Sequence, residues 1–390
     1  MMNYQKTMDN LLCNAIHAGE INGANVLMIH KGQELYRANY GYADKEQEVP
    51  MRHDTIFRLY SMTKPITAVA VMILAERGEI DLRDPVSYYL PCFCDQKVLM
   101  PDGSLVRANR DSTIWDMLHM SSGIPYPDPG HQSARDIDVI FRDAIARREA
   151  GERVDTQEYV RRIAQIPLMF HPGEKWMYGL SADILGAVVE VVSQKSYGKF
   201  LQDELFGPLA MEDTAFFVPE SKKARFAQNY IWSSEEQKLV PFTKSHLGEY
   251  YGADVAFESG GAGLVSTISD YRNFATMLLG KGTFRANKIL GVKTVEFMTK
   301  DHLTPAQKQD FNWDSLWGHG YSCLMRMVLD QGAAHTNAGI GEFGWDGWTG
   351  NFFAVSPADE LILLYFIQRC DSGMTPLMRK LRMATYGAIS

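Results

Sequence analysis

Two Ser-x-x-Lys sequences carry the residue types needed for nucleophilic catalysis by a serine hydroxyl: SMTK at Ser61–Lys64 and SYGK at Ser196–Lys199. A nucleophilic serine needs a base within hydrogen-bonding distance. Residues three apart lie on one face of a helix, so the lysine can take the serine proton when its amine is neutral. About one chance match is expected in a chain of this size with average composition, so the neighbouring residues must distinguish the two.

Ser61 stands just before ITAVAVMILA, a stretch that is apolar on every side and, as a helix, must be buried. Pro65 falls in the first turn of this helix, where a missing N–H has little consequence. A serine at the N-terminus of a buried helix lies near backbone N–H groups and the positive end of the helix dipole. Ser196 instead precedes an ordinary amphipathic surface sequence, YGKFLQDELF. We predict that Ser61 is the nucleophile and that Ser196 is a cap or turn residue.

A phenol beside the lysine would assist proton transfer, and Tyr178 is the candidate. It follows a Pro-Gly turn and precedes a predicted helix beginning near Ser181. The lysine acts as a base only when burial lowers its pKa enough to leave it neutral. Taken alone, one of 18 tyrosines is more often a half-buried packing residue.

An acyl-transfer site also needs N–H donors for an oxyanion. The sequence GEFGWDGWTGNFFAVSP supplies a glycine-rich approach to a strand, through Gly344, Gly347 and Gly350. On its own, a plain turn between strands is the favoured interpretation. The other glycine cluster, at 259–263, lacks the lysine and spacing of a phosphate-binding loop.

Composition argues against several other functions. The chain has 390 residues, with 39 Lys and Arg against 47 Asp and Glu, and the resulting charge of -8 gives no basic field for nucleic acid. The ten histidines have no clustered metal-ligand spacing, so we expect no metal ion. The chain has no G-x-S-x-G of the α/β-hydrolase type. It also has no G-x-G-x-x-G placed after a strand, as dinucleotide binding requires, so no cofactor is expected.

The chain is expected to be a cytoplasmic protein that does not associate with membranes. Its first ten residues lack the pattern of a secretory signal, and the longest apolar stretch, Ile66–Ala75, is about half a membrane span. The five cysteines are sparse and are expected to be free thiols. A leader removed earlier would change the expected location, and the oligomeric state is not readable from the sequence.

Strand patterns lie near both chain ends and helical patterns between them. Ala24–Gly41 predicts a hairpin around Lys31-Gly32, and Phe352–Gln368 predicts a second hairpin. Both hairpins are expected to join one sheet. The predicted helices are Ile66–Arg77, Ile114–Met120, Ile137–Glu149, Gln157–Ile166, Ala182–Ser193, Phe200–Phe206 and Tyr271–Leu279.

With these elements in place, the chain resembles the serine β-lactamase and penicillin-binding-protein superfamily. The likeness is to the class C β-lactamase-like branch that includes the family VIII carboxylesterases, and it covers most of the chain. The segments that carry it are Asp54–Pro91, Thr113–Tyr126, Pro172–Ser193, Gly260–Leu279 and Glu342–Pro357.

The resemblance implies roles for individual residues. Ser61 would be the acylated nucleophile, Lys64 its base partner and Tyr178 the second proton-transfer group. The superfamily's strand motif falls on Trp345-Asp346-Gly347. The backbone N–H groups of Ser61 and Trp348 would then form the oxyanion hole.

Two departures from the lactamase pattern bear on the substrate. Leu180 stands where lactamases carry an asparagine, and Trp345 where they carry a lysine that binds the substrate carboxylate. Both losses favour a neutral ester or amide over a penicillin. The residues expected to line the substrate site are Tyr60, Leu180, Trp345, Asp346 and Gly347.

The implied fold is of the α/β class, β-lactamase/transpeptidase-like. An antiparallel sheet built from both chain ends and flanked by helices would comprise residues 1–85 and 255–390. A mainly helical region would comprise residues 86–254, with the active site in the cleft between the two regions.

The leading functional hypothesis is a serine carboxylesterase that acts on small uncharged esters through an acyl-enzyme on Ser61. One alternative is an acyltransferase that passes the acyl group to an alcohol acceptor, since this uses the same intermediate. A β-lactamase or D-Ala-D-Ala peptidase is a third possibility. A non-catalytic, lactamase-like binding protein is the alternative from another class.

Overall fold

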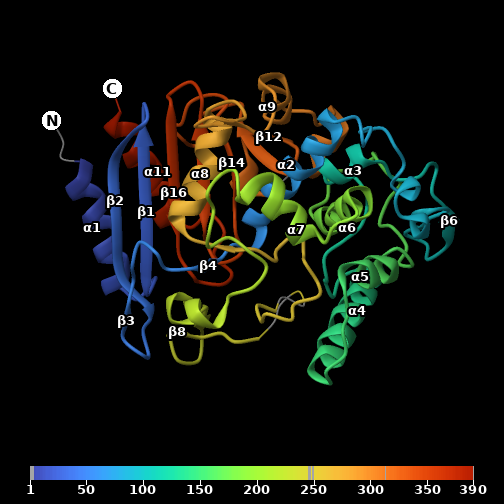
Figure 1. The fold of residues 1–390 in the computed structure, drawn as a ribbon, viewed down its shortest axis with the longest axis horizontal. Coiled ribbons are helices and arrows are strands. Elements are labelled where there is room, and N and C mark those ends of the chain that lie inside the picture. Colours follow the sequence, from blue (N-terminus) through green and yellow to red (C-terminus); the bar gives the residue numbers. More distant parts are fainter. Residues whose placement is uncertain (1–3, 245–246, 248–249, 312, 390) are drawn as a thin grey trace.

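An eight-stranded antiparallel sheet forms the centre of the fold (Figure 1). The structure is a computed structural model that describes residues 4–244, 247, 250–311 and 313–389. The strand order is β12-β13-β14-β15-β16-β1-β2-β3. At its centre, β1 (Gly23–His30) pairs with β16 (Leu361–Phe366), with Val26 opposite Tyr365. The two chain ends therefore build one sheet, as predicted.

Both predicted hairpins are present in this sheet. One joins β1 to β2 (Gln33–Asp44), and the other joins β15 (Phe352–Ser356) to β16. The sequence did not predict the two strands at one edge, whose short segments are buried throughout and show no alternation. The remaining strands of the sheet are β3 (Val49–Pro50), β12 (His319–Ser322), β13 (Met325–Val328) and β14 (Phe343–Asp346).

Helices cover both faces of the sheet. Successive residues of β16 point to opposite faces, so Leu363 packs in one apolar cluster and Leu364 in the other. The cluster of Leu363 includes side chains of α1 (Tyr4–His17) and α11 (Pro376–Ala388). The cluster of Leu364 includes α8 (Ile268–Leu279), which lies across β15 and β16 (Figure 1). Strands β1, β14, β15 and β16 are buried along almost their whole length, so this part of the sheet gives a rigid frame for nearby residues.

The central helix α2 (Thr63–Glu76) is buried from Thr63 to Leu74. Its apolar sequence predicted this position. It packs against α6 (Ser181–Ser193), and α6 in turn contacts α3 (Ile114–Leu118) and α5 (Thr156–Ile163). The lysine at the start of α2 is therefore enclosed by protein on every side.

Besides α3, α5 and α6, the described residues of the region from 86 to 254 form two further α-helices. They also form two small hairpins that the sequence did not predict. The division of this region from the sheet region stays a prediction. The helices here are α4 (Gln132–Glu149) and α7 (Tyr197–Leu201), followed by a π-helical turn at Gln202–Phe206; the hairpins are β5–β6 (Lys97–Leu99, Leu105–Arg107) and β7–β8 (Tyr230–Ser233, Lys238–Pro241).

The other short elements surround the sheet. They are β4 (Phe57–Arg58), β9 (Val265–Ser266), β10 (Thr283–Phe284), β11 (Asn287–Lys288), α9 (Val292–Met298) and α10 (Pro305–Asp310). Among the described residues, no helix combines the length and the apolar character needed to span a bilayer.

Candidate active site

Ser61 lies in a single 3-10 turn, Tyr60–Met62, that leads directly into α2. The turn is held from two sides. The Tyr271 hydroxyl donates to the Met62 carbonyl at 2.9 Å, and the Leu59 N–H donates to the Leu264 carbonyl at 2.9 Å. Tyr60 has a φ of +46°, a left-handed conformation that an ordinary residue adopts only where its surroundings enforce it. Ser61 therefore has a fixed, half-buried position at the N-terminus of α2.

Lys64 is completely buried one turn further along, and its Nζ has three neighbours. Nζ lies 3.1 Å from Ser61 Oγ, 2.8 Å from the Tyr126 hydroxyl and 2.8 Å from the Gly261 carbonyl. A carbonyl only accepts, so the amine must donate one N–H to Gly261. When the amine is neutral, its lone pair can accept the Ser61 O–H. This is the geometry required of a general base.

Burial lowers the pKa of Lys64 to about 7, because an ammonium loses its hydration in the protein interior. The charges of Asp183 and Asp346 raise the pKa, but their effect is smaller than that of burial. Neutral and protonated forms of Lys64 are therefore both populated near neutral pH. Lys64 can take the Ser61 proton there and return it later.

Tyr178 lies close to both Ser61 and Lys64. Its hydroxyl accepts from Trp345 Nε1 at 3.0 Å, and its ring lies 4.7 Å from Lys64 Nζ. Burial raises the pKa of Tyr178 well above its usual value, although hydrogen bonds to Ser61 and Trp345 oppose this effect. Tyr178 is thus a neutral phenol, which can pass a proton between the serine and a leaving group. Its role in proton transfer stays a prediction.

Tyr126 is a member of the site that the sequence analysis did not single out. Its hydroxyl lies against Lys64 Nζ, and its ring packs 5.6 Å from that of Tyr178. Burial raises its pKa well above the usual value, so it too is a neutral phenol. The sequence feature that could have identified Tyr126 is its position at the end of Thr113–Tyr126, one of the segments that carry the superfamily resemblance.

Asp183 holds the loop whose carbonyl binds Lys64. Its Oδ1 accepts from Ser259 Oγ at 2.5 Å and from the Gly261 N–H at 3.2 Å. A Cβ at position 261 would lie 2.6 Å from Asp183 Oδ2, so a larger residue would displace this carboxylate. The glycine cluster at 259–263 thus helps to position the lysine.

The end of β14 meets the turn that carries Ser61. A Cβ at Gly347 would lie 2.5 Å from the Leu59 carbonyl, so glycine allows the two backbones to touch. Asn351 Nδ2 donates to the Arg58 carbonyl at 2.7 Å and fixes the loop after the strand. The ring of Trp348 then packs edge-on against Tyr60, with 5.2 Å between centroids. This brings Trp348 beside the serine turn, although its N–H as an oxyanion donor stays a prediction.

Comparison with known proteins shows the family of this chain. Residues 8–386 match the profile of the family described as Beta-lactamase. The chain belongs to the Beta-lactamase family. The resemblance inferred from the sequence is confirmed, and the protein is a serine hydrolase of the β-lactamase and penicillin-binding-protein fold.

Two relatives match along most of the chain. Esterase EstB of Burkholderia gladioli is 32% identical over 393 residues, which cover 97% of this chain and 94% of EstB. Protein Rv1367c of Mycobacterium tuberculosis is 32% identical over 363 residues, covering 90% of this chain and 87% of that protein.

Solved structures share the fold and confirm the predicted fold class. EstCE1, a hydrolase with promiscuous acyltransferase activity, aligns with a TM-score of 0.81 at 24% identity, covering 98% of both chains. Simvastatin synthase (LovD) from Aspergillus terreus aligns with a TM-score of 0.82 at 22% identity, covering 99% of both chains.

Of the expected substrate-site residues in this Beta-lactamase family member, four lie together near Ser61. Tyr60 and Trp345 are almost fully buried, and Asp346 and Gly347 follow Trp345 at the end of β14. Leu180 lies at the start of α6, with 1% of its surface exposed, and packs in the apolar core. A direct contact between any of these five and a substrate stays a prediction.

Asp346 has a structural partner that the sequence analysis did not foresee. It forms an ion pair with Arg326 of β13, whose side chain is 5% exposed. The Arg326 guanidinium also lies 5.2 Å from the centre of the Trp345 ring. Arg326 therefore holds Asp346 at the strand end and packs on the indole that contacts Tyr178.

Ser196 caps a helix, as predicted. Its Oγ accepts from the Lys199 N–H at 3.2 Å at the start of α7. The Lys199 side chain is bonded to Asp203 at 2.6 Å. The second Ser-x-x-Lys sequence therefore has no catalytic geometry.

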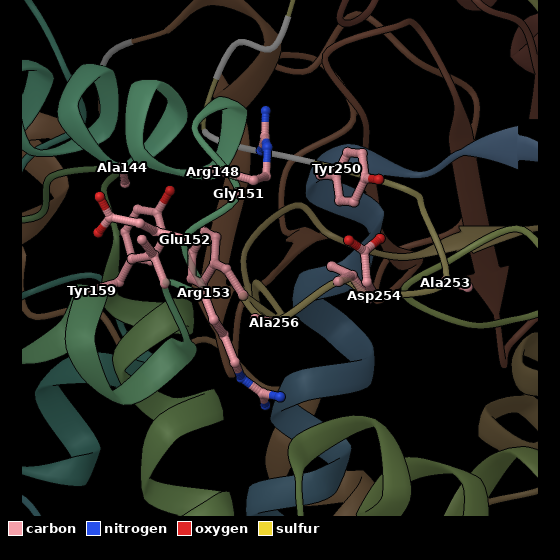
Figure 2. Close-up of a pocket in the computed structure, with 13 residues that line it drawn as sticks. Ala144, Arg148, Gly151, Glu152, Arg153, Tyr159, Tyr250, Ala253, Asp254 and Ala256 are labelled. Carbon is pink, nitrogen blue, oxygen red and sulfur yellow. The ribbon is translucent and has the colours of Figure 1, made fainter.

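A separate pocket of about 340 Å³ lies between α4, α5 and residues 250–257 (Figure 2). Tyr159 and Phe257 stack within it at 3.9 Å, and Arg148 lies over the ring of Tyr250 at 4.9 Å. None of the predicted catalytic residues lines this pocket.

The buried lysine predicts a specific pH dependence. Only neutral Lys64 can accept the serine proton, so kcat/KM for a neutral ester should fall about tenfold per pH unit below about pH 7. Initial rates between about pH 5 and about pH 9 would measure this, with circular dichroism to show that the protein stays folded. A rate that does not change across this range would contradict the assignment of Lys64 as the base.

Replacing Asp346 should move that pH dependence in a defined direction. The negative charge of Asp346 raises the pKa of Lys64, so Asp346→Asn should lower this pKa and shift the acid limb of kcat/KM to lower pH. The unpaired charge of Arg326 would act in the same direction. Asp102→Asn, in an exposed turn, is the matched control and should leave the profile unchanged. A shift of the Asp346→Asn profile to higher pH would show that this electrostatic account is wrong.

Proposed function

We propose that the protein is a carboxylesterase that hydrolyses small uncharged esters through an acyl-enzyme on Ser61. The observation that carries the proposal is the buried Lys64 amine, 3.1 Å from Ser61 Oγ and with a pKa of about 7. A base with this pKa can remove the serine proton near neutral pH without a metal ion or a cofactor.

The reaction has two stages. Ser61 Oγ attacks the ester carbonyl and its proton passes to Lys64 Nζ, while the N–H groups of Ser61 and Trp348 stabilise the oxyanion. Collapse of the tetrahedral intermediate expels the alcohol, which receives a proton through Tyr178. Water then attacks the acyl-enzyme by the same route, releasing the carboxylic acid and restoring the Ser61 hydroxyl.

The charges around the site favour an uncharged substrate. Two cations beside the catalytic groups, Lys64 and Arg326, are almost fully buried. Lys64 faces Ser61, Tyr126 and Gly261, and Arg326 is paired with Asp346. Neither is available to a substrate carboxylate, and Trp345 stands where the resemblance predicts a lysine in lactamases. A penicillin carboxylate would be poorly compensated.

Acyl transfer is the second candidate, because an alcohol can replace water in the second stage. The likeness in fold to EstCE1, a hydrolase with promiscuous acyltransferase activity, supports acyl transfer as this second candidate. Partition of the acyl group between water and an added alcohol would separate the two activities, since only transfer yields a new ester.

The role of Ser61 is tested by a pair of serine variants. Ser61→Ala should lower the hydrolysis of an aryl ester by several orders of magnitude, whereas Ser196→Ala should retain nearly full activity. Mass spectrometry after exposure to the ester should find an acyl group on Ser61 in the Ser196→Ala variant. If Ser61→Ala retained more than about a tenth of the activity, a loss too small for a missing nucleophile, the assignment would fail.

The substrate class is tested by comparing two substrates on the same enzyme. We expect an aryl butyrate to be hydrolysed with a higher kcat/KM than a chromogenic cephalosporin, because the cephalosporin carboxylate finds no cation at Trp345. A higher kcat/KM for the cephalosporin would overturn the esterase proposal and restore the β-lactamase alternative.

A further inference from the structure

One exposed aromatic side chain, Trp313, contacts the phenol that is proposed to pass a proton to the leaving group. The rings of Trp313 and Tyr178 pack edge-on, with 5.3 Å between their centroids. Among the described residues, Tyr178 also contacts the rings of Tyr126, Trp176 and Trp345, each of which is buried or half-buried. Trp313 is instead 43% exposed. It therefore extends the aromatic wall of the site out to solvent.

The local structure holds Trp313 in place. The Leu316 N–H donates to the Trp313 carbonyl at 2.9 Å, at the start of the 3-10 turn Asp314–Leu316. Phe311 and Leu316, on either side of Trp313 in the sequence, are 7% and 1% exposed. The Trp176 ring packs edge-on against both Phe311 and Trp313, at 4.7 and 5.5 Å. A ligand that packs on Trp313 therefore meets a side chain that is already ordered, which lowers the entropic cost of binding.

The position of Trp313, rather than its exposure, points to a ligand. Single apolar side chains are often exposed on protein surfaces. In the proposed reaction, however, the oxygen of the departing alcohol must come within hydrogen-bonding distance of the Tyr178 hydroxyl, from which it takes a proton. The carbon group on that oxygen then lies near Trp313.

This wall offers rings rather than charges to a substrate. Arg326, which packs on Trp345, is paired with Asp346. An aromatic group packed on the exposed indole gains affinity from burial of apolar surface. The ring contact itself adds about two- to tenfold. A saturated ring of the same size gains only from the burial.

We propose that Trp313 binds the alcohol part of the ester and makes the enzyme selective for esters of aromatic alcohols. The inference rests on the proposed esterase function and specifies its substrate. During the first stage, the aromatic ring packs on the Trp313 indole while the ester oxygen faces the Tyr178 hydroxyl. In acyl transfer, the acceptor alcohol occupies the same place.

The test compares benzyl butyrate with cyclohexylmethyl butyrate, which differ in the aromaticity of one ring. Both esters give the same butyryl-enzyme, so a difference in kcat/KM arises in the first stage, while the alcohol is still attached. With each value normalised to the ester's rate of hydrolysis by hydroxide, kcat/KM for the benzyl ester should be about threefold or more higher. Equal values, or a preference for the saturated ring, would overturn the inference.

Variants of Trp313 locate the contact. Trp313→Leu should lower kcat/KM for benzyl butyrate about tenfold and remove the preference, whereas Trp313→Phe should keep most of it. Trp232→Leu is the matched control, because Trp232 is 41% exposed in the β7–β8 hairpin, and it should change neither value. A preference that survives in Trp313→Leu would show that another residue selects the alcohol.

Methyl butyrate separates contact with the alcohol from a structural effect on Tyr178. Its methyl group is too small to pack on the indole, so Trp313→Leu should hydrolyse it as fast as the unaltered chain. An equal loss of kcat/KM for all three esters would show that Trp313 only positions Tyr178, and the inference would fail.

The same measurements distinguish failure of this inference from failure of the esterase proposal. Hydrolysis of methyl butyrate by the unaltered chain, without a preference between the two larger esters, would overturn the role of Trp313 and leave the esterase proposal intact. Hydrolysis of none of the three esters would overturn the esterase proposal, and the role of Trp313 with it.

Discussion

Burial of the Lys64 amine without a directly bonded carboxylate is the constraint on which the active site depends. An isolated ammonium is costly to bury, so the protein interior favours the neutral amine. Its three neighbours, Ser61, Tyr126 and Gly261, are all uncharged. The nearby carboxylates have other partners: Asp183 accepts from Ser259 and Gly261, and Asp346 pairs with Arg326. The pKa of Lys64 thus stays low because no carboxylate is bonded directly to its amine.

The fold supplies this environment through backbone contacts between distant segments. The buried helix α2 encloses the lysine, and the strand end at Gly347 presses against the carbonyl of Leu59. The Tyr271 hydroxyl holds Met62 from the side of α8. Because strands β14 to β16 are buried, these contacts have fixed distances. In the proposed reaction the serine, lysine and tyrosine therefore need little rearrangement.

Features that depend on residues close together in the sequence could be predicted, whereas contacts between distant segments could not. Ser61 and Lys64 are three residues apart before an apolar helix, and both hairpins show their turns, so these features could be predicted. Tyr178 needed the family resemblance as well. Tyr126 and Arg326 act through contacts with residues far along the chain, and no spacing rule connects them. Strands β12 and β13 are short and buried throughout, so they carry no alternating pattern.

The central claim is that Lys64 is neutral for much of the time near neutral pH, and NMR can measure this directly. With lysine labelled by ¹³C at Cε, the signal of Lys64 is the one that disappears in the Lys64→Met variant. Its chemical shift should titrate with a pKa of about 7. A titration at the ordinary lysine value, about 10.4, would contradict the account, because the amine would then be protonated when it has to accept the serine proton.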